Sequence, residues 1–425
     1  MMRAGEPPAC RKDGEDVGHR SGTESGDRSV TTYLANVTVF DGRTTKAKRG
    51  VLVGDDGKIS WVGPHARAPR AAAGGASVDG AHKTLTPGLI DCHVHLQFDG
   101  DADFEAEGRS LTPTMGALKA ARNARRHLER GVTTVRDLGG IDAVSAEVGA
   151  AIHAGMVPGA RVLAAGRALT VTGGHGHNIA IARQVDGADA VRAAVREEIR
   201  AGARAIKVIA TGGVLTPGIG ATFSAYTPEE LAAAVDEAHR WGRGVAAHAI
   251  GTEGILNAVR AGVDSVEHCN HATAEVVREM KTRGTFRSPT ICAIRGIIDH
   301  ADVVAAYAVE KAAAMEDASR DSHRRAVRGG VRHVCGTDAG TPFNPHGNAP
   351  QELVYMVEWG MTPLAAMRAA TANGAELLRL EDVGTIEAGK IADLVLFDEN
   401  PAEDIVSVTR PRAVWKAGEP VGLRP

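Results

Sequence analysis

The chain has 425 residues, of which 43% are hydrophobic and 24% are charged, and its formal net charge is −3. These values are typical of a globular protein with a sizeable core, and no apolar run approaches the roughly 18 residues of a membrane-spanning helix. The small net charge indicates neither nucleic acid nor a membrane as partner. The five cysteines are dispersed without the spacing of a zinc finger or a disulfide framework, which predicts reduced thiols in a cytoplasmic protein.

Both ends of the chain contain short strand patterns. Residues 1–29 come first and are polar, charged and rich in Gly, Ser and Pro, which predicts a disordered leader. Within 30–84, the Asp-Asp-Gly turn of 49–63 predicts a hairpin. Strand patterns return within 383–425, where Glu-Ala-Gly-Lys marks a second hairpin and Lys-Ala-Gly-Glu a third, at 411–421. We predict that 30–84 and 383–425 together form a small β-sandwich domain.

The middle of the chain, 85–382, alternates between strand and helix patterns. Strands are predicted at 85–96, 131–140, 160–174, 203–213, 244–251, 264–269, 285–293 and 331–340. Helices are predicted at 114–130, 187–202, 228–242, 252–261, 273–283, 301–329, 349–359 and 363–379. Eight strands separated by helices predict an α/β fold with a (β/α)8 TIM-like barrel, and a doubly wound open sheet is the alternative.

Residues that can bind a metal stand at the ends of the predicted strands. His93 and His95 are two apart in the first strand, so both imidazoles face the same side, and neutral imidazole is the commonest metal ligand in proteins. Other strands end in Lys207, His248, His268 and Asp338. A single histidine at a strand end is usually an ordinary hydrogen-bonding residue, but the strands of a barrel end at one shared mouth. Six such side chains at that mouth predict a metal site.

Lys207 and Asp338 add chemistry to this predicted site. Lys207 lies between Ile206 and Val208, where a charged ammonium is costly to bury. Either it pairs with a carboxylate, or its pKa falls from about 10.4 and the neutral amine adds carbon dioxide to give a carbamate that bridges two metals. Asp338 is a candidate to hold a metal and to accept a proton from metal-bound water, whose pKa drops from about 15.7 towards 7.

Five motifs carry a resemblance to a known family: PGLIDCHVHL, IKVIATGG, AAHAIG, SVEHC and GTDAG. Together with the ending AATANGAELLRL and GTIEAGKIADLVLF, they make about residues 30–425 similar to the amidohydrolase superfamily, in the branch with imidazolonepropionase-like and prolidase-like members. That branch includes carboxypeptidases that act on Xaa-Arg/Lys dipeptides and N-acyl amino acids, and hydrolases of ochratoxin. The resemblance implies a TIM barrel, a homo-oligomer and a small-molecule amide or dipeptide as substrate.

The resemblance also implies how the ligands are shared between two divalent metals, with Zn²⁺ as the expected ion. The more buried metal is expected on His93, His95 and Asp338, the other on His248 and His268, and carboxylated Lys207 between them. A hydroxide between the metals is implied as the nucleophile, and Asp338 as the residue that moves its proton to the leaving nitrogen. The motif of the sixth strand usually continues with Gly, whereas Cys269 follows here, and Glu267 is expected to support the ligands from behind.

Substrate contacts are expected from the loops that follow the strands. By resemblance or by topology these contacts are His175, His177, Tyr226 and His346. His175 ranks before His177 because it follows a double glycine that lets the backbone approach a ligand. For the other two, packing at a helix start or support of a loop is the alternative. Arg136 and Asp137, at the end of the second strand, are predicted to form a structural pair.

The predicted function is hydrolysis of an amide or peptide bond at a dinuclear metal centre. The predicted product is a C-terminal amino acid released from dipeptides or N-acyl amino acids, ochratoxin-like amides included. Hydrolysis of another amide, a carbamate or a urea-like compound is the alternative among hydrolases. A cyclic deaminase with one metal is a different class, and Lys207 argues against it because such deaminases usually lack the bridging lysine. A scaffold protein on a decayed barrel is disfavoured because every ligand is present.

Overall fold

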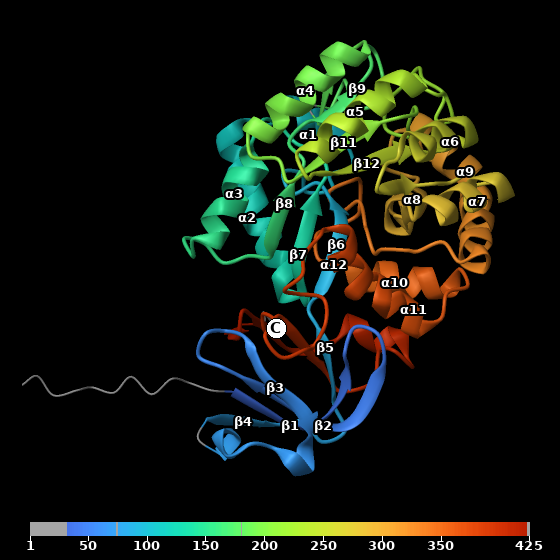
Figure 1. Ribbon diagram of the computed structural model, residues 1–425. Coiled ribbons are helices and arrows are strands. Elements are labelled where there is room, and N and C mark those ends of the chain that lie inside the picture. The colour runs from blue at the N-terminus through green and yellow to red at the C-terminus, as the bar shows by residue number, and fades with distance from the viewer. Residues whose placement is uncertain (1–31, 74, 180, 423–425) are drawn as a thin grey trace, which may run out of the picture.

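The computed structural model describes residues 32–73, 75–179 and 181–422 of the chain. The leader predicted for 1–29 lies outside these residues. Figure 1 shows two parts, a sheet at the bottom made of blue and red segments and a larger α/β part above it. The blue and red segments are hydrogen bonded to one another, so both ends of the described chain contribute to the lower part.

The lower part, here called the terminal sheet, is one hydrogen-bonded sheet of eight strands. Its strands are β1 Thr32–Phe40, β2 Thr45–Val53, β3 Ile59–Pro64, β4 Ala76–Asp79, β5 Thr84–Pro87, β15 Leu394–Phe397, β16 Pro411–Lys416 and β17 Glu419–Val421. They follow the order β17-β16-β15-β5-β1-β2-β3, with β4 beside β1. Apolar side chains from both ends, among them Leu34, Val51 and Leu394, pack into one core. The described strands belong to a single sheet, so the expected sandwich is not confirmed.

The predicted hairpins form at the two ends of the chain but not at the third position. β2 and β3 pair antiparallel around the turn at 55–57, and β16 and β17 pair antiparallel around 417–418. The turn at 387–390 closes no hairpin, because β15 pairs with β5 on one side and β16 on the other. This pairing joins the C-terminal strands β15, β16 and β17 to the N-terminal strands edge to edge, with β15 beside β5.

The upper part, here called the barrel part, contains two parallel sheets. One sheet consists of β6 Leu89–Val94, β7 Val132–Asp137 and β8 Arg161–Ala164, and the other of β9 Ala168–Thr170, β10 Ala182–Gln184, β11 Ala205–Ile209, β12 Gly244–Ala249, β13 Ser265–His268 and β14 Phe286–Ser288. The two sheets meet where the backbone N–H of Arg204 donates to the carbonyl oxygen of Ala164 at 2.7 Å. Parallel strands alternating with helices fit the α/β fold that the sequence predicts.

The eighth predicted strand, 331–340, is not a regular strand. Its isolated parallel bridges are Val94 with Ala339 and Arg287 with His333. Asp338 has a φ of 61°, which lies in the left-handed region and interrupts an extended chain. The third predicted strand, 160–174, is likewise divided, into β8 and β9. The irregular segment still lies between β6 and β14, the strands that border the two sheets.

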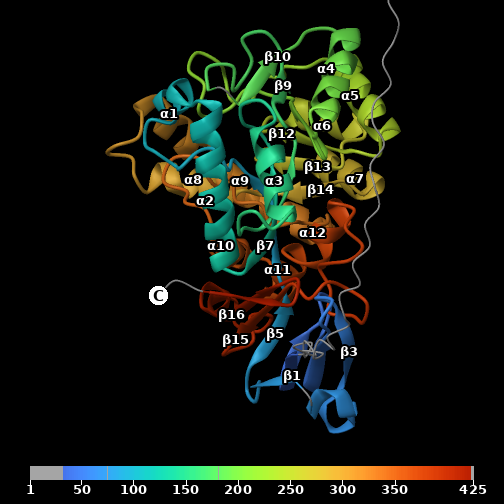
Figure 2. The same ribbon diagram turned by 90° about the vertical axis from the view of Figure 1, so that its left-hand side faces the viewer.

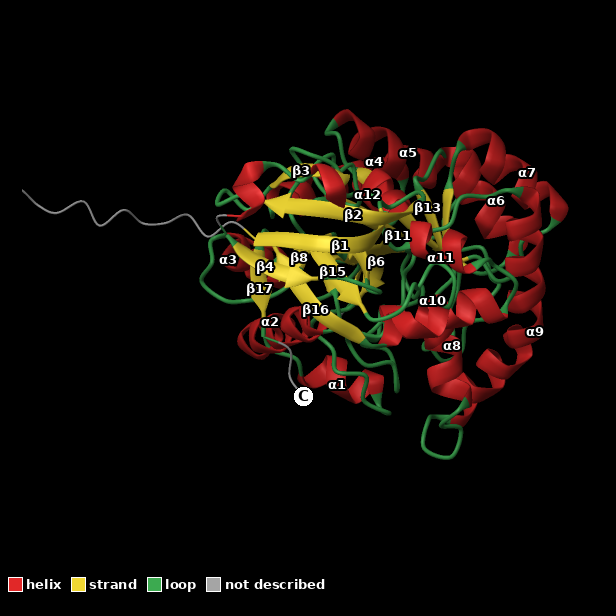
Figure 3. Cartoon of the chain, turned by 90° about the horizontal axis from the view of Figure 1, so that it is seen from below, coloured by secondary structure: helices red, strands yellow, loops and turns green. Residues whose placement is uncertain are grey.

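Helices cover the strands of the barrel part, as Figure 2 and Figure 3 show from two further directions. They are α1 Phe104–Ser110, α2 Pro113–Glu129, α3 Val144–His153, α4 Ala188–Arg200, α5 Pro228–Arg240, α6 Thr252–Ala261, α7 Ala274–Arg283, α8 Ile291–Ile298, α9 Ala306–Gly329, α10 Ala349–Glu358, α11 Pro363–Ala369 and α12 Ala372–Leu377. The helix predicted for 363–379 is divided at Thr371, whose φ of −136° and ψ of −97° are not helical. In the described chain, no helix has the length and hydropathy that a membrane span requires.

The two parts are joined through β5, which continues into β6 at Gly88. The backbone N–H of Gly88 donates to the carbonyl oxygen of Asp393 at 2.8 Å. The carboxylate of Asp393 accepts from Nη1 of Arg161, the first residue of β8, at 2.9 Å. In Figure 1, β5 leads from the terminal sheet up to β6, the strand with the predicted histidine pair. The terminal sheet therefore anchors the strand that leads into the candidate site.

Leu394 lies in β15 between β5 and β16 and is 1% exposed. Leu394→Ala removes contacts from the core that both chain ends share, and we expect the free energy of unfolding to fall by about 2–5 kcal/mol. Urea titration followed by circular dichroism measures this loss. Val406→Ala is the control, because Val406 is 50% exposed and its truncation should cost less than about 0.5 kcal/mol. Equal losses in the two variants would contradict the shared core.

Candidate metal centre

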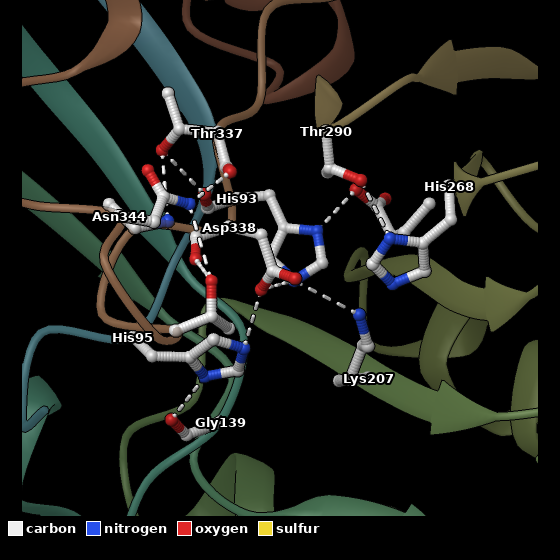
Figure 4. A network of polar contacts seen from close by, with 12 residues as sticks. His93, His95, Gly139, Lys207, His268, Thr290, Thr337, Asp338 and Asn344 are labelled. Atoms are coloured by element: carbon white, nitrogen blue, oxygen red, sulfur yellow. Dashed lines mark hydrogen bonds and ion pairs between the residues drawn. The ribbon is translucent and has the colours of Figure 1, made fainter. Parts of the chain in front are cut away.

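Two histidines of β6 and one aspartate converge in the barrel part. Asp338 Oδ1 lies 3.2 Å from Nε2 of His93 and 3.1 Å from Nε2 of His95. Figure 4 shows both rings directed at this carboxylate. β6 presents the two histidines together because alternate residues of a strand face the same side. All three residues are buried, so their ligand atoms meet in a site with little access to water.

The outer nitrogens of both rings are also engaged. His93 Nδ1 lies 3.0 Å from Oε2 of Glu267, and His95 Nδ1 lies 2.8 Å from the carbonyl oxygen of Gly139. Both partners are acceptors, so in the neutral rings Nδ1 carries the hydrogen and Nε2 presents its lone pair towards Asp338. An imidazole whose second nitrogen is held in this way is the usual form of a metal ligand.

The charges of this group favour a cation at its centre. Burial raises the pKa of Asp338, but the neighbouring His93 and His95 outweigh it and hold the pKa well below its usual range. Burial lowers the pKa of His95, but the hydrogen bond and charge of Asp338 outweigh it and raise the pKa. The ionised carboxylate of Asp338 therefore faces both Nε2 atoms, and a metal ion at this position would be stabilised by its charge.

Lys207 of β11 reaches the same point. Its Nζ is 3.4 Å from Nε2 of His93, and only 3% of the residue is exposed. Burial lowers the pKa of Lys207 to about 8, against the opposing pull of Glu267 and Asp338. An amine with this pKa has an appreciable neutral fraction at neutral pH, and the neutral form is the nucleophilic one.

His248 of β12 and His268 of β13 complete the cluster. Their ring centres are 4.5 Å apart, and that of His268 is 5.4 Å from that of His93. His268 Nδ1 lies 2.7 Å from the hydroxyl of Thr290, and His248 Nε2 lies 2.8 Å from the carbonyl oxygen of Gly212. Burial and the positive neighbours hold the pKa of both rings well below its usual range. Each ring is therefore neutral and keeps one nitrogen for a ligand.

The residues fit a divalent metal. The ligand atoms of His93, His268 and Asp338 lie within 4.8 Å of one another, a spacing that a single ion spans. Imidazole nitrogens and carboxylate oxygens are the donors that zinc and related divalent metals prefer. The tautomers of the histidines and the buried carboxylate are consistent with binding of a divalent metal.

Glu267 lies behind the cluster and is held by Arg136. Arg136 Nη2 donates to Oε1 of Glu267 at 2.9 Å, and its Nε donates to the carbonyl oxygen of Cys92 at 2.6 Å. The predicted pair of Arg136 and Asp137 is therefore wrong, because successive residues of a strand point to opposite sides. Asp137 instead accepts from the backbone N–H of Leu96 at 2.9 Å.

The backbone is strained at several residues of the site. φ is 61° at Asp338, 68° at His268 and 52° at Thr290. Left-handed residues other than glycine cost about 1–3 kcal/mol each and persist where the surroundings fix them. The hydroxyl and N–H of Thr337 donate to Asp91 at 2.7 and 3.1 Å, which fixes the chain beside Asp338. Strain of this kind is typical of functional sites.

A cavity that is partly open to solvent adjoins the cluster, and its empty space, open solvent included, is about 750 Å³. All six predicted ligands contribute to its wall. The rest of the wall is mainly apolar and includes Phe104, Leu138, Ile181, Leu215, Ile294 and Met315. A compound bound in this cavity would place its apolar groups against the wall and a polar group beside the six predicted metal ligands.

Of the four predicted substrate contacts, His175 is the one that lines this cavity. His177 is exposed, and its Nδ1 bonds to a backbone carbonyl in its own loop at 2.7 Å. The hydroxyl of Tyr226 donates to the carbonyl oxygen of Val185 at 3.0 Å, inside a core of helices and strands. His346 is buried with its Nε2 2.7 Å from a backbone carbonyl. The structure thus brings one of the four predicted contacts into the cavity wall, while backbone acceptors hold the other three side chains elsewhere.

Several supporting residues were not predicted from the sequence. Thr290 and Thr337 hold His268 and the chain at Asp338, as Figure 4 shows. The sequence marks Arg136 only as a strand-end residue and does not indicate its bond to Glu267. Threonine after a strand is common, and its position directly before a ligand, as in Thr337, is the one cue that the sequence offers.

The amidohydrolase family matches residues 84–421. The chain belongs to this family. It is 34% identical to ochratoxinase of Aspergillus niger, over 93% of this chain and 87% of that protein. The crystal structure of the A. niger ochratoxinase superposes with a TM-score of 0.81, with 32% identity over 92% of this chain and 95% of that one.

Two further relatives lie in the branch that the sequence resembles. The crystal structure of a Xaa-Pro dipeptidase, with methionine bound in its active site, superposes with a TM-score of 0.85, with 33% identity over 92% of this chain and 99% of that one. An imidazolonepropionase of Sphingopyxis alaskensis is 29% identical over 83% of this chain and 88% of that protein. The resemblance seen in the sequence is confirmed.

As an amidohydrolase, the protein is a hydrolase that acts on C–N bonds. The fold of its relatives implies a TIM barrel for the barrel part. Amidohydrolases typically bind metal ions, and the cluster around Asp338 is the candidate site in this chain.

The substitution Glu267→Gln tests whether Glu267 helps the candidate centre to bind metal. The change removes the negative charge beside Arg136 and leaves one acceptor oxygen for Arg136 and His93 Nδ1 together, so we expect metal affinity to fall by about 10–100-fold. Stability should fall by about 3–5 kcal/mol, because Arg136 is left buried and unpaired. Metal content measured during titration with a chelator gives the affinity. Glu229→Gln, at an exposed position of α5, is the control, and equal affinity in the two variants would remove Glu267 from this role.

Proposed function

We propose that this amidohydrolase cleaves the amide bond of N-acyl amino acids and dipeptides and releases a C-terminal amino acid, ochratoxin-like amides included. The observation that carries the proposal is the convergence of six metal-competent side chains in the wall of one mainly apolar cavity. The relatives support an amide substrate, because an ochratoxinase and a Xaa-Pro dipeptidase are 34% and 33% identical to the chain.

The proposed centre holds two divalent metals, with zinc as the expected ion. We assign one metal to His93, His95 and Asp338, the other to His248 and His268, and carboxylated Lys207 to the position between them. In support, each of the four histidines keeps one ring nitrogen for a ligand. The other nitrogen is hydrogen bonded in His95, His248 and His268, and in His93 it lies 3.0 Å from Oε2 of Glu267. The lowered pKa of Lys207, about 8, supports the neutral amine that carbamate formation needs.

Bound divalent metals would supply polarisation of the substrate carbonyl and a nucleophile from water at neutral pH. Asp338 handles the proton. Its pKa lies below the usual range, so the carboxylate is ionised at neutral pH. In this form it would accept the proton that water loses. The same carboxylate lines the cavity and then donates that proton to the leaving nitrogen, which departs as an amine.

The cavity wall favours apolar substituents on the substrate. Aromatic and aliphatic residues such as Phe104, Leu215 and Met315 line it, and no arginine or glutamate does within the described chain. Burial of one apolar side chain is worth roughly 1.5–3 kcal/mol. A basic C-terminal residue finds no carboxylate in this wall apart from Asp338. The lining therefore supports an apolar leaving amino acid over arginine or lysine.

A neutral amide, carbamate or urea-like compound is the second candidate substrate. The absence of arginine from the described cavity wall favours it, because no guanidinium is present to bind a substrate carboxylate. A deaminase with one metal has less support, since Lys207 lies within 3.4 Å of His93 and would have no role there.

Lys207→Ala removes the proposed bridge. We expect the metal-replete variant to lose most of its bound metal and its activity, because both metals lose a shared anionic ligand. Elemental analysis of the purified protein measures the metal. Lys416→Ala is a matched control, since Lys416 is also partly buried, with a pKa of about 8, but bonds to Gly159 far from the cluster. Two metals per chain in Lys207→Ala would contradict the assignment.

A substrate panel tests the proposed reaction. Metal-reconstituted protein is assayed with N-acetyl amino acids and dipeptides that differ in the C-terminal residue, with carbamates and phenylureas beside them. We expect kcat/KM for C-terminal Phe, Leu or Met to exceed that for Arg, Lys or Asp by about tenfold or more. Asp338→Asn serves as the inactive control. Turnover of carbamates or ureas alone would favour the second candidate.

A further inference from the structure

The loop between β11 and α5, residues 210–227, is held by one lysine of α9. Lys311 Nζ donates to the carbonyl oxygens of Gly213 at 3.2 Å, Thr216 at 2.7 Å and Ile219 at 2.7 Å. An ammonium has three hydrogens, so these three bonds use all of them. The charge of Lys311 is thus directed at the backbone of this loop, which we call the β11 loop.

The β11 loop in turn holds His175. The hydroxyl of Thr216 lies 2.8 Å from Nδ1 of His175. Gly213 packs on the ring, where an added Cβ would lie 2.4 Å from Nε2 and Cδ2, so this close approach requires glycine. Lys311 therefore fixes both loop residues that position the imidazole.

The position of the hydrogen on His175 depends on Asn178. The Thr216 hydroxyl has one hydrogen to donate and two lone pairs. It accepts from the backbone N–H of Gly176 at 3.0 Å and lies 3.0 Å from Oδ1 of Asn178. In this orientation Thr216 donates to Asn178, and His175 must donate from Nδ1. Nδ2 of Asn178 is then buried without a partner.

Rotation of the Asn178 amide by half a turn gives Nδ2 a hydrogen-bond partner. Nδ2 then donates to the Thr216 hydroxyl, which still accepts from Gly176 and now donates to Nδ1 of His175. The rotation puts Oδ1 of Asn178 at the buried position that has no partner. This is favourable because an unpartnered buried N–H is rarer in proteins than an unpartnered carbonyl oxygen. His175 then carries its hydrogen on Nε2, which has no hydrogen-bond partner in the described chain and belongs to the cavity wall.

We propose that Asn178, Thr216 and Lys311 form a positioning unit that holds His175 as a hydrogen-bond donor towards the substrate. The identity of the acceptor, a carbonyl or carboxylate oxygen of an amide, rests on the proposed function, whereas the tautomer does not. A donor stabilises an oxygen whose negative charge grows during the reaction, and a lone pair at the same position repels it. By setting which ring nitrogen carries the hydrogen, the unit therefore decides whether His175 stabilises or repels the substrate oxygen.

The tautomer is read directly by ¹⁵N NMR of the zinc-loaded full chain with ¹⁵N-labelled histidine, and the signals of His175 are identified by their loss in His175→Gln. We expect the hydrogen on Nε2 in the wild type. Asn178→Asp leaves a carboxylate that only accepts, so Thr216 must donate to it and the hydrogen should move to Nδ1 of His175. A wild-type ring with hydrogen on Nδ1, or the same tautomer in both proteins, would overturn the proposal.

Kinetics separate positioning from a merely structural role. Thr216→Val keeps the shape but loses the hydroxyl, and we expect kcat/KM to fall by about 10–100-fold with metal content and melting temperature retained. Thr216→Ser restores the hydroxyl and should recover most of the loss. Equal activity of Thr216→Val and wild type would contradict the role of the hydroxyl.

Hydrogen exchange tests the part played by Lys311. Lys311→Met should speed exchange of the β11 loop amides and raise KM, while Lys281→Met, on α7, should change neither. An unchanged loop in Lys311→Met would remove Lys311 from the unit. If no substrate in the panel is hydrolysed, the proposed function fails, yet the NMR result still decides the tautomer.

Discussion

The ion pair of Arg136 and Glu267 is the interaction on which the metal centre depends. Their side chains are 2% and 0% exposed, so both charges have left water, and such a pair is stable only with further hydrogen bonds. Arg136 supplies one to the carbonyl oxygen of Cys92, and Glu267 receives one from the hydroxyl of Ser265. The pair thereby connects β6, β7 and β13. Because Glu267 holds the outer nitrogen of His93, the same contact that joins these strands turns the inner nitrogen towards Asp338.

The buried position also decides the charges of the ligands. In this environment Asp338 stays ionised because His93 and His95 lie beside it, whereas burial, with Lys207 and the neighbouring histidines adding to it, lowers the pKa of His248 and His268 and keeps them neutral. Neutral imidazoles and an ionised carboxylate are the forms that bind metal. The fold therefore prepares the ligands electrostatically, and the strained backbone at Asp338 prepares them geometrically.

Sequence reasoning succeeds where a rule is local. The spacing of His93 and His95 follows from the period of a strand, and the gathering of strand ends follows from the barrel. Where a side chain finds its partner far along the chain, no local rule gives its direction. The hydroxyl of Tyr226 bonds to a residue 41 positions away and His346 to one 248 positions away, so nothing near either residue indicates its direction. The left-handed backbone at Asp338 likewise depends on a distant contact, from Thr337 to Asp91.

The β11 loop connects the apolar and the polar sides of the cavity. Its residues Val214 and Leu215 belong to the wall, and the hydroxyl of Tyr307 in α9 donates to the carbonyl oxygen of Leu215 at 3.3 Å. The next residue, Thr216, bonds to His175. One loop thus sets both the shape offered to apolar substituents and the hydrogen bond offered to the substrate's polar group. A substitution in this loop changes the two together, so selectivity for the apolar group and the rate of hydrolysis are coupled through the contacts that α9 makes with it.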